Sequence, residues 1–141
     1  MSRTYIYSRA HIIFSTKHRQ KFLKKKYEGR LIGYIGALIK EQKGKLLEAN
    51  TMPDHIHLYV SLRSDPSIST IMRLVKTNSS KWMKETFEHY GNFSWQLGYG
   101  YFSVSPSKEA KTLSYIRNQT KHHGQISFKE EFIVFFGKTQ N

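Results

Sequence analysis

Cysteine is absent from the 141 residues of this chain. Its absence excludes disulfide scaffolds, thiol catalysis and zinc sites built on cysteine, and it fits a reducing cytoplasm. Long apolar runs are missing as well, because no stretch approaches the roughly 18 residues that a membrane span requires. Residues 1–5 also lack the apolar character of a signal peptide. We therefore expect a cytoplasmic protein that neither spans a membrane nor is secreted.

Acidic residues are scarce relative to basic ones. The 10 Asp and Glu residues against 23 Lys and Arg give a formal net charge of +13. Such a charge attracts polyanions, and nucleic acid is the commonest large polyanion in a cytoplasm. Aromatic residues make up 14% of the chain, and the unstacked bases of single-stranded nucleic acid can stack on such side chains. The composition favours a nucleic-acid partner; a basic soluble domain with an aromatic core is the alternative.

Features that would divide the chain into domains are missing. There is no internal repeat and no linker rich in proline or serine, and the length suits one compact domain. We expect a single domain over residues 1–141. Its expected parts are a sheet core over about 5–105, a helix over about 107–123 and a tail over 124–141.

Hydrophobic periodicity predicts strands and helices in a recognisable order. The strands are expected at residues 5–16, 45–51, 55–62 and 101–104, and the helices at 27–43, 68–90 and 107–123. The order β-α-β-β-α-β followed by α is typical of an α+β ferredoxin-like (RRM-like) fold with an additional C-terminal helix. In that fold both crossover helices cover one face of an antiparallel sheet, which leaves the other face for a different use.

Strict alternation in the third predicted strand decides which of its side chains share a face. The apolar residues at even positions from 56 to 60 should meet the crossover helices, which leaves His55, His57 and Tyr59 on the opposite face. Two imidazoles about 7 Å apart along a strand are close enough to share one metal ion. Two hydrated histidines on a solvent-facing strand would give the same pattern, so spacing alone leaves both interpretations open.

The third predicted helix carries a polar face. Tyr115 and Gln119 are four positions apart and therefore stack on one side of the helix. His122 continues almost the same line, and Lys108 and Lys111 flank the tyrosine on the N-terminal side. The apolar residues of the helix fall on the opposite side. The pattern predicts a phenol that is presented rather than packed in the core.

Three motifs occur in succession along the chain. They are Met-Pro-Asp-His-Ile-His-Leu at 52–58, Trp-Gln-x-Gly-Tyr-Gly-x-Phe-Ser at 95–103 and Tyr-Ile-x-Asn-Gln-x-x-His-His at 115–123. Together they resemble the single-tyrosine HUH transposases of the insertion sequence 200/605 family. The resemblance runs from about residue 5 to residue 136, and no motif position departs from the family pattern.

The resemblance implies a role for each matching residue. Tyr115 matches the nucleophile, which attacks a DNA phosphodiester and keeps the 5′ phosphate as a covalent phosphotyrosine. His55 and His57 match the pair that ligates a divalent metal ion, and Gln119 matches the third ligand. We expect Mg²⁺ in cells, with Mn²⁺ also competent and more tightly bound, because Mn²⁺ tolerates nitrogen ligands better.

The resemblance also implies partners. The family works as a homodimer on single-stranded DNA, recognises hairpins near the ends of its element, and acts at the prokaryotic nucleoid; no small-molecule substrate is expected. The tyrosine helix of one subunit can complete the site of the other, and residues 105–107 are the candidate hinge here.

Five side chains are candidate DNA contacts, with a solvated surface residue as the alternative for each. They are Arg73, Lys76, Lys108, Lys111 and His122.

Other functions stay open from the residues alone. A non-catalytic single-stranded nucleic-acid-binding module of ferredoxin-like fold accounts for the charge and the aromatic residues. It does not account for the joint occurrence of Tyr115, Gln119 and the two histidines. In a metal-dependent phosphodiesterase, water would attack and Tyr115 would be dispensable. A domesticated relative would process repeated hairpins of its host genome without mobile DNA.

Overall fold

The computed structural model describes residues 4–119. The strands are β1 (Arg9–Ser15), β2 (Lys45–Met52), β3 (His55–Ser61) and β4 (Gly100–Ser103). The α-helices are α1 (Lys25–Glu41), α2 (Ile68–Thr86) and α3 (Glu109–Arg117), and the short 3₁₀ helices are η1 (Lys17–Arg19), η2 (Glu88–Tyr90) and η3 (Pro106–Lys108). Apart from the 3₁₀ turns, this is the order that the hydrophobic periodicity predicts.

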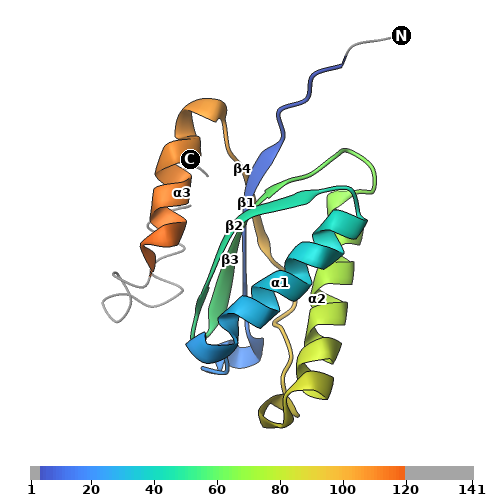
Figure 1. Ribbon diagram of the computed structural model, residues 1–141, viewed down its shortest axis with the longest axis vertical. Helices are drawn as coiled ribbons and strands as arrows, with labels where there is room; N and C mark the ends of the chain where they lie inside the picture. The colour runs from blue at the N-terminus through green and yellow to red at the C-terminus, as the bar shows by residue number, and fades with distance from the viewer. Residues whose placement is uncertain (1–3, 120–141) are drawn as a thin grey trace.

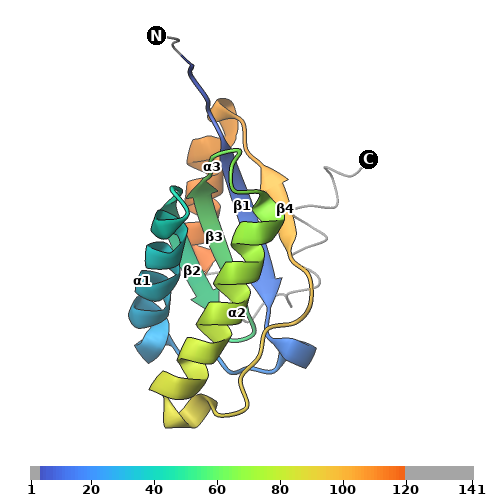
Figure 2. The same ribbon diagram turned by 90° about the vertical axis from the view of Figure 1, so that its right-hand side faces the viewer.

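The strands form one antiparallel sheet in the order β2-β3-β1-β4. Helices α1 and α2 cover one face of this sheet, and α3 lies on the opposite face (Figures 1 and 2). The predicted α+β ferredoxin-like fold with an additional helix is therefore confirmed. Because β1 and β3 are the two central strands, their side chains are the most deeply enclosed on both faces.

The main core lies between the sheet and the crossover helices. Ile56, Leu58 and Val60 of β3 are fully buried and belong to one apolar cluster with Ile35 of α1 and Val75 of α2. Strand alternation predicts this division of β3. The buried apolar layer stabilises the fold by roughly 1.5–3 kcal/mol for each large side chain removed from water, and it gives the opposite face a rigid support.

Several elements begin or end at other residues than expected. β1 begins at Arg9 rather than at residue 5, because its pairing with β3 starts at Arg9 and its pairing with β4 at Ala10. α2 ends at Thr86, because Phe87 leaves helical geometry with φ −120° and ψ 115°. The Phe87 ring instead packs against that of Tyr27, with 4.3 Å between the ring centroids.

The turn from α1 into β2 depends on a glycine. A Cβ atom at Gly44 would lie 2.8 Å from Leu62 Cδ2 and 3.1 Å from the Ser61 carbonyl oxygen. The left-handed residue of this turn is the preceding Lys43, with φ 65°. Gly44 is therefore required for close approach to the end of β3.

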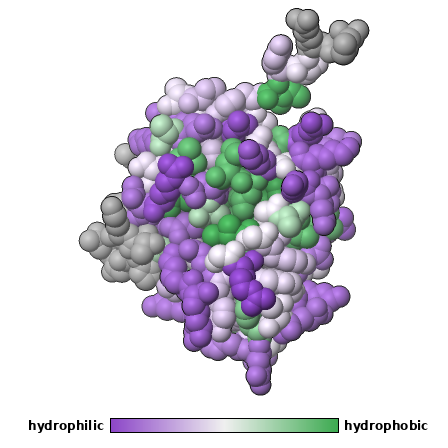
Figure 3. All heavy atoms as spheres, viewed as in Figure 1, coloured by the Kyte–Doolittle hydropathy of each residue, from purple (hydrophilic) through white to green (hydrophobic). Residues whose placement is uncertain are grey.

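The molecular surface is mixed. On the face viewed in Figure 1, apolar side chains gather near the middle and hydrophilic ones surround them (Figure 3). Among residues 4–119, none of the helices has the length and apolarity that crossing a bilayer would require.

Candidate active site

The face of the sheet under α3 carries both histidines of β3. His55 is 3% exposed and His57 is 0% exposed, and their ring centroids lie 5.0 Å apart. Their predicted position on one face is confirmed. The alternative of two hydrated histidines on a solvent-facing strand is wrong, because both rings are buried.

Each of these imidazoles uses its Nδ1 atom in a hydrogen bond. His55 Nδ1 donates to Asp54 Oδ1 at 2.7 Å, since a carboxylate can only accept. His57 Nδ1 lies 2.8 Å from Nε2 of His11, a residue of β1. In metal-binding histidines one ring nitrogen bonds the metal while the other is held by a neighbouring acceptor. Both side chains have this type of support at Nδ1.

Tyr115 lies against the same histidines. Its ring centroid is 5.8 Å from that of His57 and 6.1 Å from that of His11, both in edge-on geometry. The structure thus brings the predicted nucleophile and a predicted metal ligand together. The expectation that the apolar side of α3 lies opposite the tyrosine is wrong: Thr112 and Ile116 are buried toward the sheet, and the half-buried Tyr115 shares that side.

Gln119 lies just past the end of α3. The continuous helix ends at Arg117, Asn118 follows as a turn with φ −98° and ψ 10°, and Gln119 is again helical. Gln119 is 1% exposed. Its amide nitrogen makes no hydrogen bond within residues 4–119. Since the two ends of an amide exchange by rotation, an unsatisfied buried amide fits the expected ligand role.

The donor set is mixed in type. Within the described part of the chain, no three His, Cys, Asp or Glu side chains gather as a metal site. The candidate set instead combines two imidazoles with one amide. Imidazole suits transition metals such as Mn²⁺ better than it suits Mg²⁺. The residues present therefore fit a divalent cation of this class.

Hydrogen bonds attach the N-terminal end of α3 to the sheet. Glu109 Oε2 accepts from the phenol of Tyr59 at 2.6 Å and from that of Tyr7 at 2.8 Å. Arg9 Nε lies 3.3 Å from the same oxygen. The hydrogen bond from Tyr59 is the largest cause of a lowered pKa at Glu109. Burial, followed by the contact with Glu109, raises the pKa of Tyr59.

A second attachment holds the C-terminal end of α3. Asn50 Nδ2 donates to the Ile116 carbonyl oxygen at 2.9 Å, while its Oδ1 accepts from Lys25 Nζ at 2.8 Å. Arg117 Nε donates to Glu48 Oε2 at 2.6 Å. Because both ends are attached, α3 holds Tyr115 against the histidines of its own sheet.

The candidate DNA contacts lie in different places. Lys108 and Lys111 are exposed at the beginning of α3. Arg73 and Lys76 belong to α2, which covers the other face of the sheet (Figure 2). His122 lies outside the described residues. Of the described candidates, the structure therefore brings only Lys108, the last residue of η3, and Lys111 of α3 to the side of the sheet that carries the histidines.

Lys76 has a local role that the sequence did not indicate. Its Nζ donates to the carbonyl oxygens of Gln96 at 2.5 Å and Gly98 at 2.6 Å. Burial lowers the pKa of this lysine. It thereby fixes the segment before β4.

His11 is the residue of the site that the sequence analysis missed. It is 0% exposed and contacts both His57 and Tyr115. The available signal was an imidazole at the start of an apolar run in β1, residues 11–14. Such a histidine is usually a hydrogen-bonded core residue, so the signal alone does not distinguish it.

Comparison with known proteins identifies relatives of the chain. Residues 4–119 match the family described as "Transposase IS200 like". The transposase for insertion sequence element IS200 of Salmonella typhimurium is 32% identical over 116 residues, which cover 77% of this chain and 74% of that protein. The ISDra2 transposase TnpA of Deinococcus radiodurans is 24% identical over 123 residues, which cover 83% of this chain and 88% of that protein.

Solved structures share the fold. A crystal structure from Deinococcus radiodurans, described as that of a transposase, has a TM-score of 0.65 and 26% identity, and the match covers 84% of this chain and 96% of that one. A REP-associated tyrosine transposase, solved with a REP hairpin, has a TM-score of 0.63 at 18% identity over 89% and 76% of the two chains. The chain therefore belongs to the IS200-like transposase family.

Proposed function

We propose that this transposase cleaves and rejoins single-stranded DNA through a covalent 5′-phosphotyrosine at Tyr115. The observation that carries the proposal is the edge-on contact of Tyr115 with His57, at 5.8 Å between ring centroids. His55 lies beside His57, and both imidazoles are buried and held at Nδ1. A module that only binds nucleic acid has no need of a phenol placed against two buried imidazoles.

The proposed step is an exchange of phosphate esters. The phenol oxygen of Tyr115 attacks the phosphorus, a new P–O bond forms, and the bond to the 3′ oxygen breaks. The phenol loses its proton and the departing 3′ oxygen gains one. A phenol of ordinary pKa, near 10, is a good leaving group, so a 3′ hydroxyl can attack the phosphotyrosine and restore a phosphodiester. Because the joint conserves the bond energy, rejoining requires no ATP.

His55, His57 and Gln119 would hold a divalent metal ion, Mg²⁺ in cells with Mn²⁺ also competent. When bound, such an ion would neutralise the charge that develops on the phosphate oxygens. The chain's own contribution is to orient the ligands, through Asp54 and His11, and to keep them away from water. Because these three ligands bring no negative charge, we expect weak metal affinity until the DNA phosphate is present.

We propose DNA hairpins as the substrate and a homodimer as the working form. The net charge of +13 supplies the attraction to DNA. The hairpin in the REP-associated tyrosine transposase structure supports this choice of substrate. In each subunit, the attachment of α3 at both ends supports attack by Tyr115 at the site of its own chain.

The experiment is a search for the covalent intermediate. Labelled single-stranded hairpin DNA is incubated with Mg²⁺ and wild type, Tyr115→Phe or the control Tyr99→Phe, and protein–DNA adducts are separated under denaturing conditions. Tyr99 is a suitable control because it is 39% exposed and lies outside the site. We expect an adduct with wild type and Tyr99→Phe only, while Tyr115→Phe still binds the hairpin.

Two outcomes would overturn the proposal. Cleavage by Tyr115→Phe at the wild-type rate would identify a nuclease in which water attacks. Hairpin binding by wild type with neither cleavage nor adduct would identify a binding module.

A further inference from the structure

His11 contacts both the candidate nucleophile and a candidate metal ligand. It is fully buried in the central strand β1. Its Nε2 atom is 2.8 Å from His57 Nδ1, and the two ring planes are tilted by 38°. The plane of its ring also makes an angle of 63° with that of the Tyr115 ring, in edge-on contact. A side chain in contact with both groups can control their relative positions.

We propose that His11 is a positioning residue, which fixes the tautomer and the ring orientation of His57. The proposal rests on the proposed function, because it requires His57 to bind the metal through Nε2. A neutral imidazole carries a single ring proton. A His57 that offers the Nε2 lone pair must keep its proton on Nδ1 and donate it to His11 Nε2. His11 is then the acceptor and holds its own proton on Nδ1.

The two ligand histidines therefore have acceptors of different charge. His55 donates to the carboxylate of Asp54, whose side chain is 20% exposed, whereas His57 faces a neutral imidazole in a fully enclosed position. A carboxylate in place of His11 would be costly to bury without a paired charge. It would also repel the phosphate that Tyr115 is proposed to attack. A neutral acceptor avoids both costs.

Substitutions at His11 can separate hydrogen bonding from packing. The amide end of glutamine can reach the position of Nε2, whereas that of asparagine reaches only the position of Nδ1. Phenylalanine keeps a ring and offers no acceptor. The measurement is the affinity for Mn²⁺ alone, titrated into each folded protein, together with its thermal unfolding. We expect His11→Gln to stay within about threefold of wild type, and His11→Asn and His11→Phe to lose about 10–100-fold, as is typical for the partner of a ligating histidine.

A His57→Ala variant separates failure of this proposal from failure of the function. If His57→Ala binds Mn²⁺ like wild type, the metal site itself is wrong, and the role of His11 is wrong with it. If His57→Ala loses Mn²⁺ while His11→Phe and His11→Asn retain it, only the positioning role is wrong. Equal losses in all three His11 variants, with equally lowered melting temperatures, would show that His11 only fills space and would also overturn the proposal.

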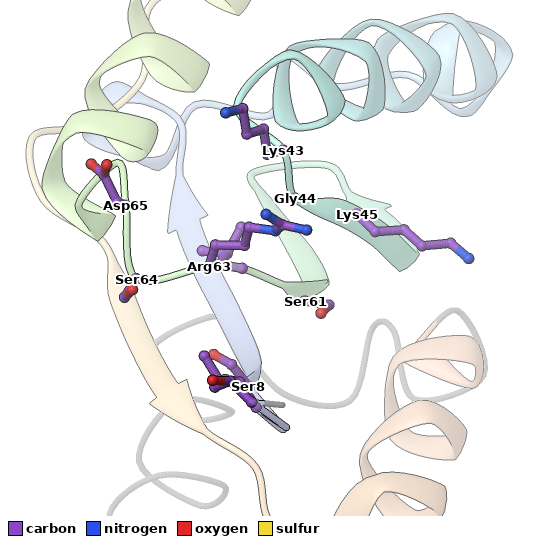
Figure 4. A pocket seen from close by; sticks show the side chains of 11 residues that line it. Ser8, Lys43, Gly44, Lys45, Ser61, Arg63, Ser64 and Asp65 are labelled. Carbon is purple, nitrogen blue, oxygen red and sulfur yellow. The ribbon is translucent and has the colours of Figure 1, made fainter. Parts of the chain in front are cut away.

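A basic pocket supplies a second and independent observation. A cavity of about 650 Å³ lies at the end of β3 farther from His55, beside the turn between α1 and β2 (Figure 4). Its charged lining is Lys43, Lys45, Arg63 and a single carboxylate, Asp65. Figure 4 shows Arg63 across the middle of the pocket with the two lysines beside it. Serine hydroxyls complete the polar lining.

The three cations of this pocket are not neutralised by ion pairs in the described part of the chain. None of them makes an ion pair or a side-chain hydrogen bond within residues 4–119. Ser61, which lines the pocket, follows His57 by four positions on β3. At about 3.3 Å per residue the pocket begins some 13 Å along the strand from that histidine.

From this arrangement we infer that the pocket binds backbone phosphates of the same DNA that Tyr115 is proposed to cleave. This inference rests on the proposed function for its ligand. Phosphate contacts make nucleic-acid affinity depend on salt, and the slope of that dependence falls by roughly 0.7–0.9 for each phosphate that the protein no longer neutralises. The relevant variant is therefore Lys45→Ala with Arg63→Ala.

A matched control keeps the net charge equal. Lys40→Ala with Lys84→Ala removes two exposed cations outside the pocket. Hairpin affinity is measured across a salt series for wild type and both double variants. We expect the pocket variant alone to lower the salt slope by about 1.4–1.8. Identical slopes for the two double variants would overturn the pocket assignment, while a wild type that binds no hairpin at any salt would overturn the proposed function as well.

Discussion

At the scale of single residues, the proposed metal ligands differ in how replaceable they are. His57 is fully buried and held by His11, whereas Gln119 offers a neutral amide beyond the end of α3. We expect His57→Ala to abolish both Mn²⁺ binding and DNA cleavage. Gln119→Ala should weaken Mn²⁺ binding by about tenfold or less, because water can replace a neutral oxygen ligand. Mn²⁺ titration and adduct yield check this order, and equal losses in the two variants would contradict it.

The position of a residue on one face of an element was predictable where the repeat of that strand or helix determines it. The shared face of His55 and His57 follows from strand alternation alone. The role of His11 does not, because its partner His57 lies 46 positions away and only the pairing of β1 with β3 brings them together. The orientation of Tyr115 was wrong for a related reason: the periodicity of α3 was interpreted without knowing which side of the helix meets the sheet.

At the scale of elements, α3 is a helix of 9 residues, which is too short to be stable alone. Its N-terminal attachment depends on ionised Glu109, whose pKa is lowered first by the hydrogen bond from Tyr59. A carboxyl group whose pKa is lower in the folded than in the unfolded protein stabilises the fold. This stabilisation is fully present at pH values above the unfolded pKa, and it is lost as the pH falls through the folded pKa. We therefore expect Glu109→Gln to lower the melting temperature at pH 7.

The same substitution should cost progressively less as pH falls below the ordinary carboxyl pKa of 4.5, because protonation removes the charge in wild type as well. Glu41→Gln is the control, since Glu41 is exposed at the end of α1 and has no hydrogen bond or ion pair from its side chain within residues 4–119. Melting temperatures of the three proteins at pH 7 and pH 3.5 provide the measurement. A difference between Glu109→Gln and wild type that does not change with pH would exclude this role for the carboxylate.

The elements themselves were largely predictable, and their ends were less so. Within residues 4–119, sequence patterns identified every strand and α-helix, because each element buries one face against a neighbouring layer. The ends depend on partners that are distant in sequence. β1 could not be limited to Arg9–Ser15 without knowing where β3 and β4 pair with it, and α2 could not be ended at Thr86 without the contact of Phe87 with Tyr27.

At the scale of the whole molecule, the proposed dimer can be tested for exchange of α3 between subunits. Tyr115→Phe and His57→Ala subunits are mixed and assayed for cleavage of hairpin DNA. If each Tyr115 acts beside the histidines of its own chain, every site in the mixture lacks one of the two groups. We expect no recovery of cleavage, because α3 is attached at both ends to its own sheet. Co-purification of differently tagged Tyr115→Phe and His57→Ala subunits through one tag verifies that mixed dimers form, and recovery of cleavage in them would show that α3 acts on the partner's sheet.

The position of α3 at the end of the described chain has a consequence for how the protein is made. The buried histidines come from β1 and β3, so they can meet once residues up to Ser61 have left the ribosome. Tyr115, the proposed nucleophile, is synthesised more than fifty residues later, and it reaches the histidines only when α3 docks on a finished sheet. Since domains fold progressively during synthesis, the histidine pair should form before the phenol arrives. A nascent chain would then be unable to attack DNA until α3 has left the ribosome.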